Sequence, residues 1–227
     1  DGNSILNRAF YGVRLLSNKD GVFTNAIFGF LNIFLKLLKE HSPDAVAVAF
    51  DVSRKTFRHE QYAQYKANRH GMPEELRMQL PLIQEILAAL GYAVVGCEGF
   101  EGDDILGTLS SACEQNGEDC VVVSGDRDCL QLVTDKVSVE LVRTKDNTLY
   151  TPEIFFAEYG FSPEHMIDLK GLMGDSSDNI PGVKGIGEKT AKALLLQYGS
   201  IEALYALPEE EWKVTPSVRK KLIEGRE

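Results

Sequence analysis

Short apolar runs alternate with longer helical segments through the first 150 residues, and this alternation constrains the fold more than any other feature of the sequence. The predicted helices cover residues 24–40, 74–90 and 103–116, and the predicted strands cover 45–50, 92–95, 120–124 and 137–142. Strands that alternate with helices form largely parallel sheets whose two faces are both covered. We therefore predict an α/β fold with a mixed, mostly parallel central sheet and helices on both of its faces.

The pattern changes near residue 150, where strand signals end and short helices follow one another. A Pro or Gly stands near the start or end of each predicted helix, and these helices cover residues 152–159, 163–173, 188–198, 201–207 and 217–224. With 227 residues and 44% hydrophobic side chains, the chain suits one large domain or one domain with a smaller appendage. We predict a core of residues 1–150 and a helical subdomain of residues 151–227.

Composition excludes several classes of protein. No apolar run approaches the roughly 18 residues that a membrane-spanning helix needs, so we expect no membrane association. The four cysteines include no C-x-x-C pair and the four histidines are scattered singly, so neither a zinc site nor a disulfide is predicted. The chain starts at Asp1 with neither a Met nor a signal peptide, which we interpret as a trimmed boundary.

Acidic side chains follow the predicted strands at the points where the strands end. Asp51 comes directly after strand 45–50, and Asp126 and Asp128 follow strand 120–124. Because the carboxyl ends of parallel strands meet at one edge of a sheet, we expect these carboxylates to converge there. Two more acidic groups, at the start of helix 103–116 and in the segment MGDSSDN, contribute Glu101, Asp103, Asp104, Asp175 and Asp178.

This set of acids predicts a divalent-metal site. A single Asp at a helix start is usually a cap, but four acidic groups exceed what capping requires. Two carboxylates about 4 Å apart repel by about 4 kcal/mol at an effective dielectric of about 20, so the gathered set needs cations. Oxygen ligands without His or Cys favour Mg²⁺ or Mn²⁺, and two such ions can promote phosphodiester hydrolysis. The formal charge of −10 is then concentrated in this site and does not exclude a nucleic-acid partner.

Three glycines precede the predicted helix 188–198, in the segment GVKGIGEKTA. The segment is not a P-loop, because Glu188 separates Gly187 from Lys189 and Thr190 and no strand precedes it. Glycine amides at the start of a helix can bind a DNA backbone phosphate without reading base sequence. A plain interhelical turn explains one glycine, but it poorly explains three glycines with flanking lysines.

The stretch from Ser53 to His70 carries five basic side chains against one acid, Glu60. A run of charge is usually a solvated face. This run, however, begins two residues after Asp51 and is interleaved with aromatic residues that can stack on unpaired bases. We therefore interpret it as a segment that contacts nucleic acid.

These motifs, in this order, resemble those of the 5′-nuclease domain of bacterial DNA polymerase I, a family related to phage and eukaryotic flap endonucleases. The resemblance rests on Asp1-Gly-Asn-Ser with Arg8-Ala-Phe10, Phe50-Asp51, Tyr65-Lys66-Ala-Asn-Arg69, Phe100-Glu-Gly-Asp-Asp104, Ser124-Gly-Asp-Arg-Asp128, the segment GDSSDNIPG and the glycine hairpin. It covers nearly the whole chain, and every acid of the family pattern is present. The family normally has a short strand before the position of Asp1 and more helix after the position of Glu227, and this sequence has neither.

The resemblance implies a role for each candidate residue. Asp1, Asp51, Glu101, Asp103 and Asp104 serve the first metal site, and Asp126, Asp128, Asp175 and Asp178 serve the second. Lys66 and Arg69 act as catalytic residues at the base of a helical arch around residues 54–80, in contact with the scissile phosphate. DNA contacts are expected from Arg8, Arg58, Tyr65, Gly182, Gly185, Gly187, Lys189 and Thr190. The hairpin would be a helix-three-turn-helix clamp, which can hold a K⁺ ion through backbone carbonyls.

The implied function is a structure-specific 5′ nuclease that uses two Mg²⁺ or Mn²⁺ ions in DNA replication and repair, including primer and flap removal. We expect a monomer in the bacterial cytoplasm, at the nucleoid, acting on flapped, nicked or 5′-ended duplex DNA. The resemblance also allows RNA–DNA primers as substrates and a polymerase domain in the same polypeptide. Two alternatives are a non-catalytic junction-binding module and a phosphatase with Asp51 as nucleophile. The phosphatase is disfavoured because Asp51-Val-Ser53 lacks the second Asp of a D-x-D motif.

Overall fold

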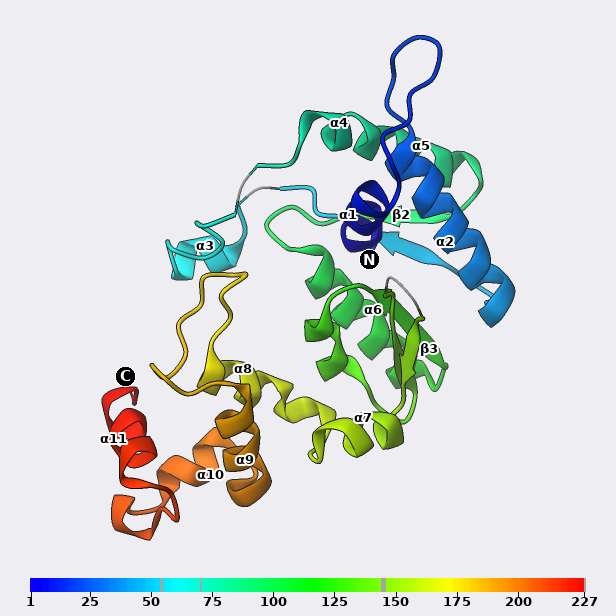
Figure 1. The fold of residues 1–227 in the computed structure, drawn as a ribbon. Coiled ribbons are helices and arrows are strands. Elements are labelled where there is room, and N and C mark those ends of the chain that lie inside the picture. The colour runs from blue at the N-terminus through cyan, green and yellow to red at the C-terminus, as the bar shows by residue number, and fades with distance from the viewer. Residues whose placement is uncertain (54, 70, 144–145, 227) are drawn as a thin grey trace.

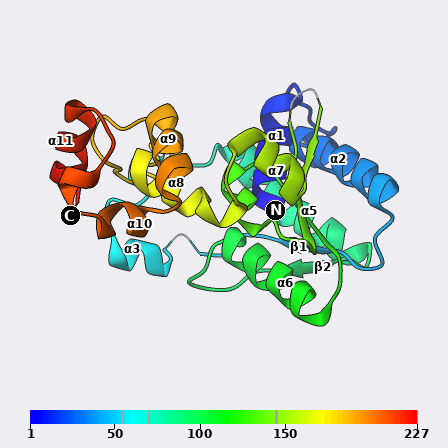
Figure 2. The ribbon, with the colours of Figure 1, turned by 90° about the horizontal axis from the view of Figure 1, so that it is seen from below.

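The computed structural model describes residues 1–53, 55–69, 71–143 and 146–226. Two views show an elongated arrangement in which α1, α2 and α5 form one end and α9 to α11 form the other (Figures 1 and 2). The helix α3 lies between the two ends, beside the loop that follows α8. No helix among the described residues is long and apolar enough to cross a membrane. The four cysteines are free thiols.

The first end is built from three helices and a small parallel sheet. Its elements are α1 (Gly2–Gly12), α2 (Asn25–His41), β1 (Ala47–Ala49), α5 (Gln79–Ala89) and β2 (Ala93–Val95). The helices α1 and α2 approach closely at Gly29, where a Cβ would come 2.8 Å from the Cβ of Ala9. The buried side chains of Phe30, Phe50 and Ile83 belong to one cluster at this end. The predicted helix 24–40 and strands 45–50 and 92–95 are confirmed, although both strands are shorter than expected.

A second sheet follows, in which β3 and β4 are parallel and β5 is antiparallel to β4. Its elements are α6 (Gly102–Asn116), β3 (Cys120–Ser124), the 3₁₀ helix η1 (Arg127–Leu132), β4 (Val137–Leu141) and β5 (Thr148–Tyr150). The predicted helix 103–116 and strand 120–124 are confirmed, and strand 137–142 is present as β4. The strand β5 was not predicted, because it is a single short run of three residues.

The prediction of one central sheet is wrong for the described residues, which form a two-stranded and a three-stranded sheet. The start of α1 lies between the two sheets. The amino group of Asp1 donates a hydrogen bond to the Val123 carbonyl of β3 (2.9 Å). On the other side, a Cβ at Gly2 would come 2.4 Å from the ring of Phe50. The two sheets therefore meet through α1 instead of through strand pairing.

The predicted arch lies in the segment between β1 and β3. We define it as the described residues 55–69 and 71–80. Two short helices are present, α3 (Phe57–Gln61) and α4 (Glu74–Arg77). Residues 54 and 70, which the basic stretch includes, lie outside the described residues. The predicted helix 74–90 is divided into α4 and α5 at Met78. Pro81 accounts for the division, because it lacks an N–H and its ring clashes with the carbonyl of the residue four positions earlier, Arg77.

The rest of the chain is helical, as predicted. It contains α7 (Pro152–Tyr159), the 3₁₀ turn η2 (Pro163–His165), α8 (Met166–Met173), α9 (Glu188–Tyr198), α10 (Ile201–Ala206), η3 (Glu209–Glu211) and α11 (Pro216–Glu224). Trp212 is buried among these helices, and its indole N–H donates to the Leu204 carbonyl (3.0 Å). One continuous buried cluster joins the second sheet to this helical part, from Val139 to Leu194. Within the part of the chain that the structure describes, the helical part thus shares this buried cluster with the second sheet.

Candidate active site

Asp51 lies directly beyond β1, at the carboxyl end of the strand, as the sequence predicted. Its Oδ1 accepts a hydrogen bond from the Gly102 amide at the start of α6 (2.6 Å). Its Oδ2 accepts a hydrogen bond from Asn3 Nδ2 in α1 (3.0 Å). Two helices that start at the sheet edge thus hold this carboxylate in place.

The start of α6 supplies three more carboxylates. Glu101 and Asp104 form a capping box, in which each side chain accepts a hydrogen bond from the backbone N–H of the other. The capping interpretation and the metal-ligand interpretation therefore both apply to these two acids. Burial, together with the nearby carboxylate of Asp126, raises the pKa of Asp103 to about 6. A carboxyl group with a raised pKa is one whose negative charge lacks full compensation.

Asp1 and Asp126 are joined through Ser124, a fully buried residue at the end of β3. Ser124 Oγ donates to Asp1 Oδ2 (2.6 Å) and accepts a hydrogen bond from the Asp126 amide (3.0 Å). Asp126 Oδ1 in turn accepts from the Asp128 amide (3.0 Å). Sequence reasoning missed Ser124, although its position between a strand and two aspartates is a usable signal.

The helical part contributes Asp175 and Asp178 from the loop after α8. Asp175 pairs with Ile180 in an isolated antiparallel bridge, which closes this loop. Lys170, which sequence reasoning also missed, joins the loop to the core: its Nζ lies 2.6 Å from Asp175 Oδ2 and 2.7 Å from Asp128 Oδ1. Burial acts to raise the pKa of Asp175, but hydrogen bonds from Lys170 and Ser177 outweigh it and hold this pKa well below its usual range.

Three basic side chains of the arch form ion pairs with acids of this group. Arg58 makes a bidentate ion pair with Asp104 (2.7 and 2.8 Å). Lys66 Nζ donates to Glu101 Oε2 (2.8 Å), and Arg69 pairs with Asp178. In this structure Arg58 therefore lies on a carboxylate, and its expected contact with DNA requires that this pair opens.

Tyr65 is buried, with 5% of its surface exposed. Its hydroxyl lies 2.9 Å from Glu101 Oε2 and 3.2 Å from Asp178 Oδ2, within hydrogen-bonding distance of both carboxylates. In this structure the ring of Tyr65 has no face open to a base, and its expected contact with DNA stays a prediction. Arg8, the other expected contact at this edge, lies against Gly125, and its Nε is buried without a hydrogen-bond partner among the described residues.

The acids do not form a ready metal cage. Within the described ranges, no three His, Cys, Asp or Glu side chains converge closely enough to hold an ion. The cations of the arch and of α8 lie against these carboxylates instead. The donor set nevertheless fits a hard divalent ion: all donors are carboxylate oxygens, and Asp128 Oδ1 is buried without a hydrogen bond of acceptable geometry. Binding of such an ion at these acids would require that it replaces the protein cations that now lie against them.

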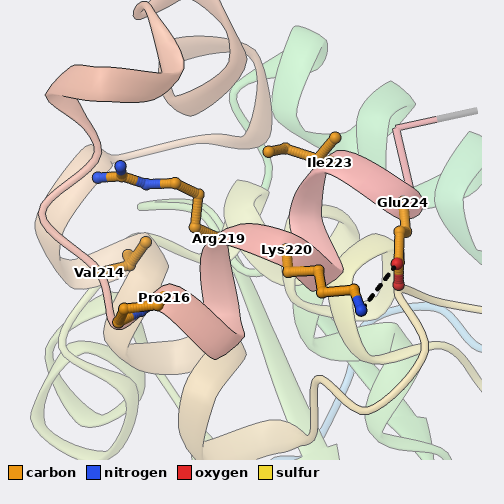
Figure 3. Close-up of a pocket in the computed structure, with 6 residues that line it drawn as sticks. All are labelled: Val214, Pro216, Arg219, Lys220, Ile223 and Glu224. Atoms are coloured by element: carbon orange, nitrogen blue, oxygen red, sulfur yellow. Dashed lines mark ion pairs between the residues drawn. The ribbon is translucent and has the colours of Figure 1, made fainter.

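Six of the nine candidate acids line one large cleft of about 970 Å³: Glu101, Asp103, Asp104, Asp128, Asp175 and Asp178. Asp126 borders a smaller hollow that shares Asp128, Lys170 and Asp175 with this cleft. The arch, the start of α6, η1 and α8 all contribute to its walls, through residues that include Tyr65, Glu101, Asp128, Lys170 and Asp178. A second pocket, about 390 Å³, lies on α11 at the far end of the helical part (Figure 3). Among the six described residues that line it, an ion pair joins Lys220 to Glu224 (3.7 Å), and Glu224 supplies the sole carboxylate. The chemistry therefore belongs to the larger cleft.

The three glycines of the hairpin differ in what they do. Gly182 packs against backbone, since a Cβ there would come 2.1 Å from the Gly174 nitrogen. Gly185 has a φ of +82°, which L side chains rarely adopt, and its carbonyl accepts a hydrogen bond from Lys221 (2.9 Å). Gly187 is the N-cap of α9, and a Cβ there would meet nothing within 4 Å. The open start of α9, with Lys189 and Thr190 in its first turn, is the part of the hairpin that a phosphate can reach.

Comparisons with known proteins agree on one family. The description "5'-3' exonuclease, N-terminal resolvase-like domain" matches residues 1–160, and "5'-3' exonuclease, C-terminal SAM fold" matches residues 161–227. DNA polymerase I of Bacillus subtilis is 49% identical over 90% of this chain. DNA polymerase I of Caldicellulosiruptor bescii is 46% identical over the whole chain. The chain spans about a quarter of the length of these relatives, 23% and 27% respectively.

Solved structures share the fold. T5 5'-exonuclease with bound divalent zinc ions matches with a TM-score of 0.80 at 23% identity, over 98% of this chain and 82% of that structure. Flap endonuclease-1 from Methanococcus jannaschii matches with a TM-score of 0.57 at 22% identity, over 98% of this chain and 76% of that structure. At these identities the likeness concerns the fold alone, a mixed α/β architecture rich in helices.

Proposed function

The chain belongs to the 5'-3' exonuclease family, and from this premise we propose that it is a structure-specific 5′ nuclease. It hydrolyses DNA phosphodiester bonds at 5′ ends, flaps or nicks, and it acts in primer and flap removal during replication and repair. The observation that carries the proposal is the common cleft, in which acids from the start of α6, from η1 and from the loop after α8 face cations of the arch and of α8.

Two divalent ions, Mg²⁺ or Mn²⁺, are the cofactors that these acids would hold. Asp1, Asp51, Glu101, Asp103 and Asp104 would serve the first ion, and Asp126, Asp128, Asp175 and Asp178 the second. When bound, such ions supply Lewis acidity for the attack of water on phosphorus and for the departure of the leaving oxygen. The carboxylates would position these ions, and the carboxylates are held in turn by hydrogen bonds such as that from the Gly102 amide to Asp51 (2.6 Å).

Lys66 and Arg69 would act on the scissile phosphate. Both now neutralise acids of the cleft, so metal binding at those acids would free the two cations for a phosphate. The backbone of Lys66 has a φ of +53°, an uncommon conformation for a residue other than glycine. Its N–H donates to the Asp178 carbonyl (2.8 Å), which supports this conformation. Such local strain is typical of residues with a functional position.

The hairpin would hold duplex DNA by its backbone. Gly187 at the open start of α9 offers amides to a phosphate, and Lys189 adds a positive charge. A K⁺ ion on backbone carbonyls of the hairpin, as the family resemblance implies, belongs to the same proposal. These contacts carry no base recognition, so the preference for a substrate arises from DNA shape. RNA–DNA primers offer a similar backbone and are proposed as further substrates.

The test is cleavage of a 5′-flap oligonucleotide by the purified chain, with products mapped at single-nucleotide resolution. We expect metal-dependent cuts near the branch point and none in the presence of a chelator. A protein that binds the flap in Mg²⁺ but leaves it intact would support the alternative of a non-catalytic junction-binding module. Hydrolysis of a small phosphate ester in the absence of DNA would instead support a phosphatase.

A further inference from the structure

Lys170 bridges a carboxylate of the core and one of the helical part, both assigned to the second proposed ion site. It lies on α8, and its Nζ is 2.7 Å from Asp128 Oδ1 and 2.6 Å from Asp175 Oδ2. Asp128 belongs to η1 and Asp175 to the loop after α8. The ammonium group therefore lies between two acids from different parts of the chain.

The ammonium group of Lys170 supplies the positive charge that a metal ion would supply between these two carboxylates. Without a positive charge between them, two neighbouring carboxylates would repel each other. Asp128 Oδ1 is buried and accepts no hydrogen bond of acceptable geometry, so its neutralisation depends on the charge of Lys170. A lysine offers a single charge on a flexible stem of four carbons, and such a group can give way to a doubly charged ion.

The surroundings allow this movement of the side chain while they fix its helix. The neighbours of Lys170 in α8, Leu169 and Leu172, are buried in the continuous core, with 3% and 1% of their surface exposed. The side chain itself borders an open hollow of about 410 Å³, whose walls also include Asp126 and Ser177. The hollow gives an ion access to the acids and gives the ammonium group room to leave.

We propose that Lys170 is a positioning residue that holds Asp128 and Asp175 together in the metal-free protein and is displaced when a divalent ion binds there. It differs from Lys66 and Arg69 in that it comes from α8 and not from the arch. Two consequences follow. Lys170 stabilises the metal-free protein, and it competes with the ion and so weakens ion binding. This inference rests on the proposed function only in that a divalent ion binds to these two carboxylates.

The test compares Lys170→Met with the wild type, and Lys136→Met serves as the matched control. Lys136 pairs with the exposed Asp119 (3.0 Å) at the opposite end of β3, so both variants lose one positive charge from an ion pair. Mn²⁺ binding is measured at a single pH by calorimetry and by the spectrum of bound Mn²⁺. We expect Lys170→Met to bind the second ion about tenfold more tightly, and Lys136→Met to bind as the wild type does.

Thermal unfolding provides a readout that a merely structural role would not reproduce. In chelator, Lys170→Met should unfold at a lower temperature than the wild type, and saturating Mg²⁺ should remove the difference. Lys170→Arg, which keeps the charge, should restore stability in chelator. Lys170→Gln is interpreted in the same way if the Met variant fails to fold.

Unchanged or weaker Mn²⁺ binding by Lys170→Met, while the wild type binds two ions, would overturn this inference alone. A loss of stability that Mg²⁺ does not recover would overturn it as well, because the residue would then support the fold irrespective of the ion. No Mn²⁺ binding by the wild type would overturn the proposed function and the inference together.

Discussion

The hydroxyl of Tyr65 lies 2.9 Å from the carboxylate of Glu101, so a buried arch residue donates a hydrogen bond to the first acid of α6. The same oxygen is 3.2 Å from Asp178, in the loop of the helical part. Burial and the two neighbouring carboxylates raise the pKa of this phenol, so it stays a neutral donor. One side chain therefore joins the arch, the core and the helical part at the proposed site.

Tyr65→Phe should destabilise the protein in chelator by about 1–2 kcal/mol, because it removes a hydrogen bond to a charged group and leaves the ring buried. Single-turnover cleavage should fall, while flap affinity should change little. Tyr62→Phe is the control, since Tyr62 is exposed and its hydroxyl makes no hydrogen bond among the described residues. Urea unfolding and rapid-quench kinetics measure the two effects. Equal stability of Tyr65→Phe and the wild type would contradict this role.

Asp126→Asn should abolish metal-dependent cleavage, with a loss larger than the roughly 10- to 100-fold typical of an outer-shell change. Flap affinity in Ca²⁺ buffer should remain close to that of the wild type. Asn keeps the size of the side chain and an oxygen that can accept from the Asp128 amide. Rates in Mg²⁺ with and without chelator are the measurement. A wild-type enzyme that cuts at full rate in chelator would disprove the metal mechanism.

Asp175→Ala should weaken binding of the second ion before that of the first. This acid belongs to the helical part, and it completes the second site only when that part is packed against the core. Calorimetric titration of Mg²⁺ without DNA should show one site fewer or a much weaker one. Asp119→Ala, an exposed acid with one ion-pair partner, is the control. An isotherm identical to that of the wild type would remove Asp175 from the set of ligands.

Lys66→Ala and Arg69→Ala should lower single-turnover rates far more than duplex affinity, since a cation at the reacting phosphate acts mainly on charge that develops in the transition state. Gly187→Val should do the reverse and weaken binding across all sequences. Each lost phosphate contact should remove roughly 0.9 from the slope of log affinity against log salt. Flap binding in Ca²⁺ at several salt concentrations, paired with rates in Mg²⁺, measures both.

Gly187 is suited to this comparison because a Cβ there would meet no protein atom within 4 Å, so the fold should tolerate Val. Gly182 is not an equivalent test, because a Cβ there would strike the backbone at Gly174. If the variants of Lys66 and Arg69 and the variant of Gly187 affected rate and affinity equally, the assignment of catalysis to the former and duplex binding to the latter would be wrong.

Ionisation of Asp103 should lower the free energy of unfolding of the metal-free protein as the pH rises from about 4 to about 6. Its pKa is raised to about 6 in the folded chain, against a reference of 3.8. The folded state thus binds more protons than the unfolded state in this window, and its stability falls as the carboxyl ionises. Above pH 6, Asp103→Asn should be more stable than the wild type in chelator by roughly 2–3 kcal/mol. Denaturant unfolding at pH 4 and pH 7 measures the difference, which should vanish at pH 4.

The acids at the ends of strands were predictable from sequence because parallel strands bring their carboxyl ends to one edge. Asp51 and Asp126 follow from this rule, and the hydrogen bonds around them agree with it. The positions of the helices were predictable as well, because their apolar periodicity is long. The division of helix 74–90 could also have been predicted, because Pro81 lies within it.

Other features depend on contacts between distant segments, and sequence patterns do not reveal them. The burial of Tyr65 results from the docking of the arch on the loop after α8, where the Lys66 amide meets the Asp178 carbonyl. The bridge made by Lys170 requires the positions of Asp128 and Asp175 in space. Similarly, no local pattern indicates that the strands form two sheets, or that the start of α1 contacts both of them.

The buried cluster that runs without a break from the second sheet into α9 has a consequence for where DNA would be cut. A duplex bound at Gly187 would be bound by helices that share this core with η1, the element that carries Asp128. The distance between the site that binds the duplex and the site of hydrolysis would then be set by the fold. Cleavage would fall at a set number of nucleotides from the gripped duplex, whatever the bases in between.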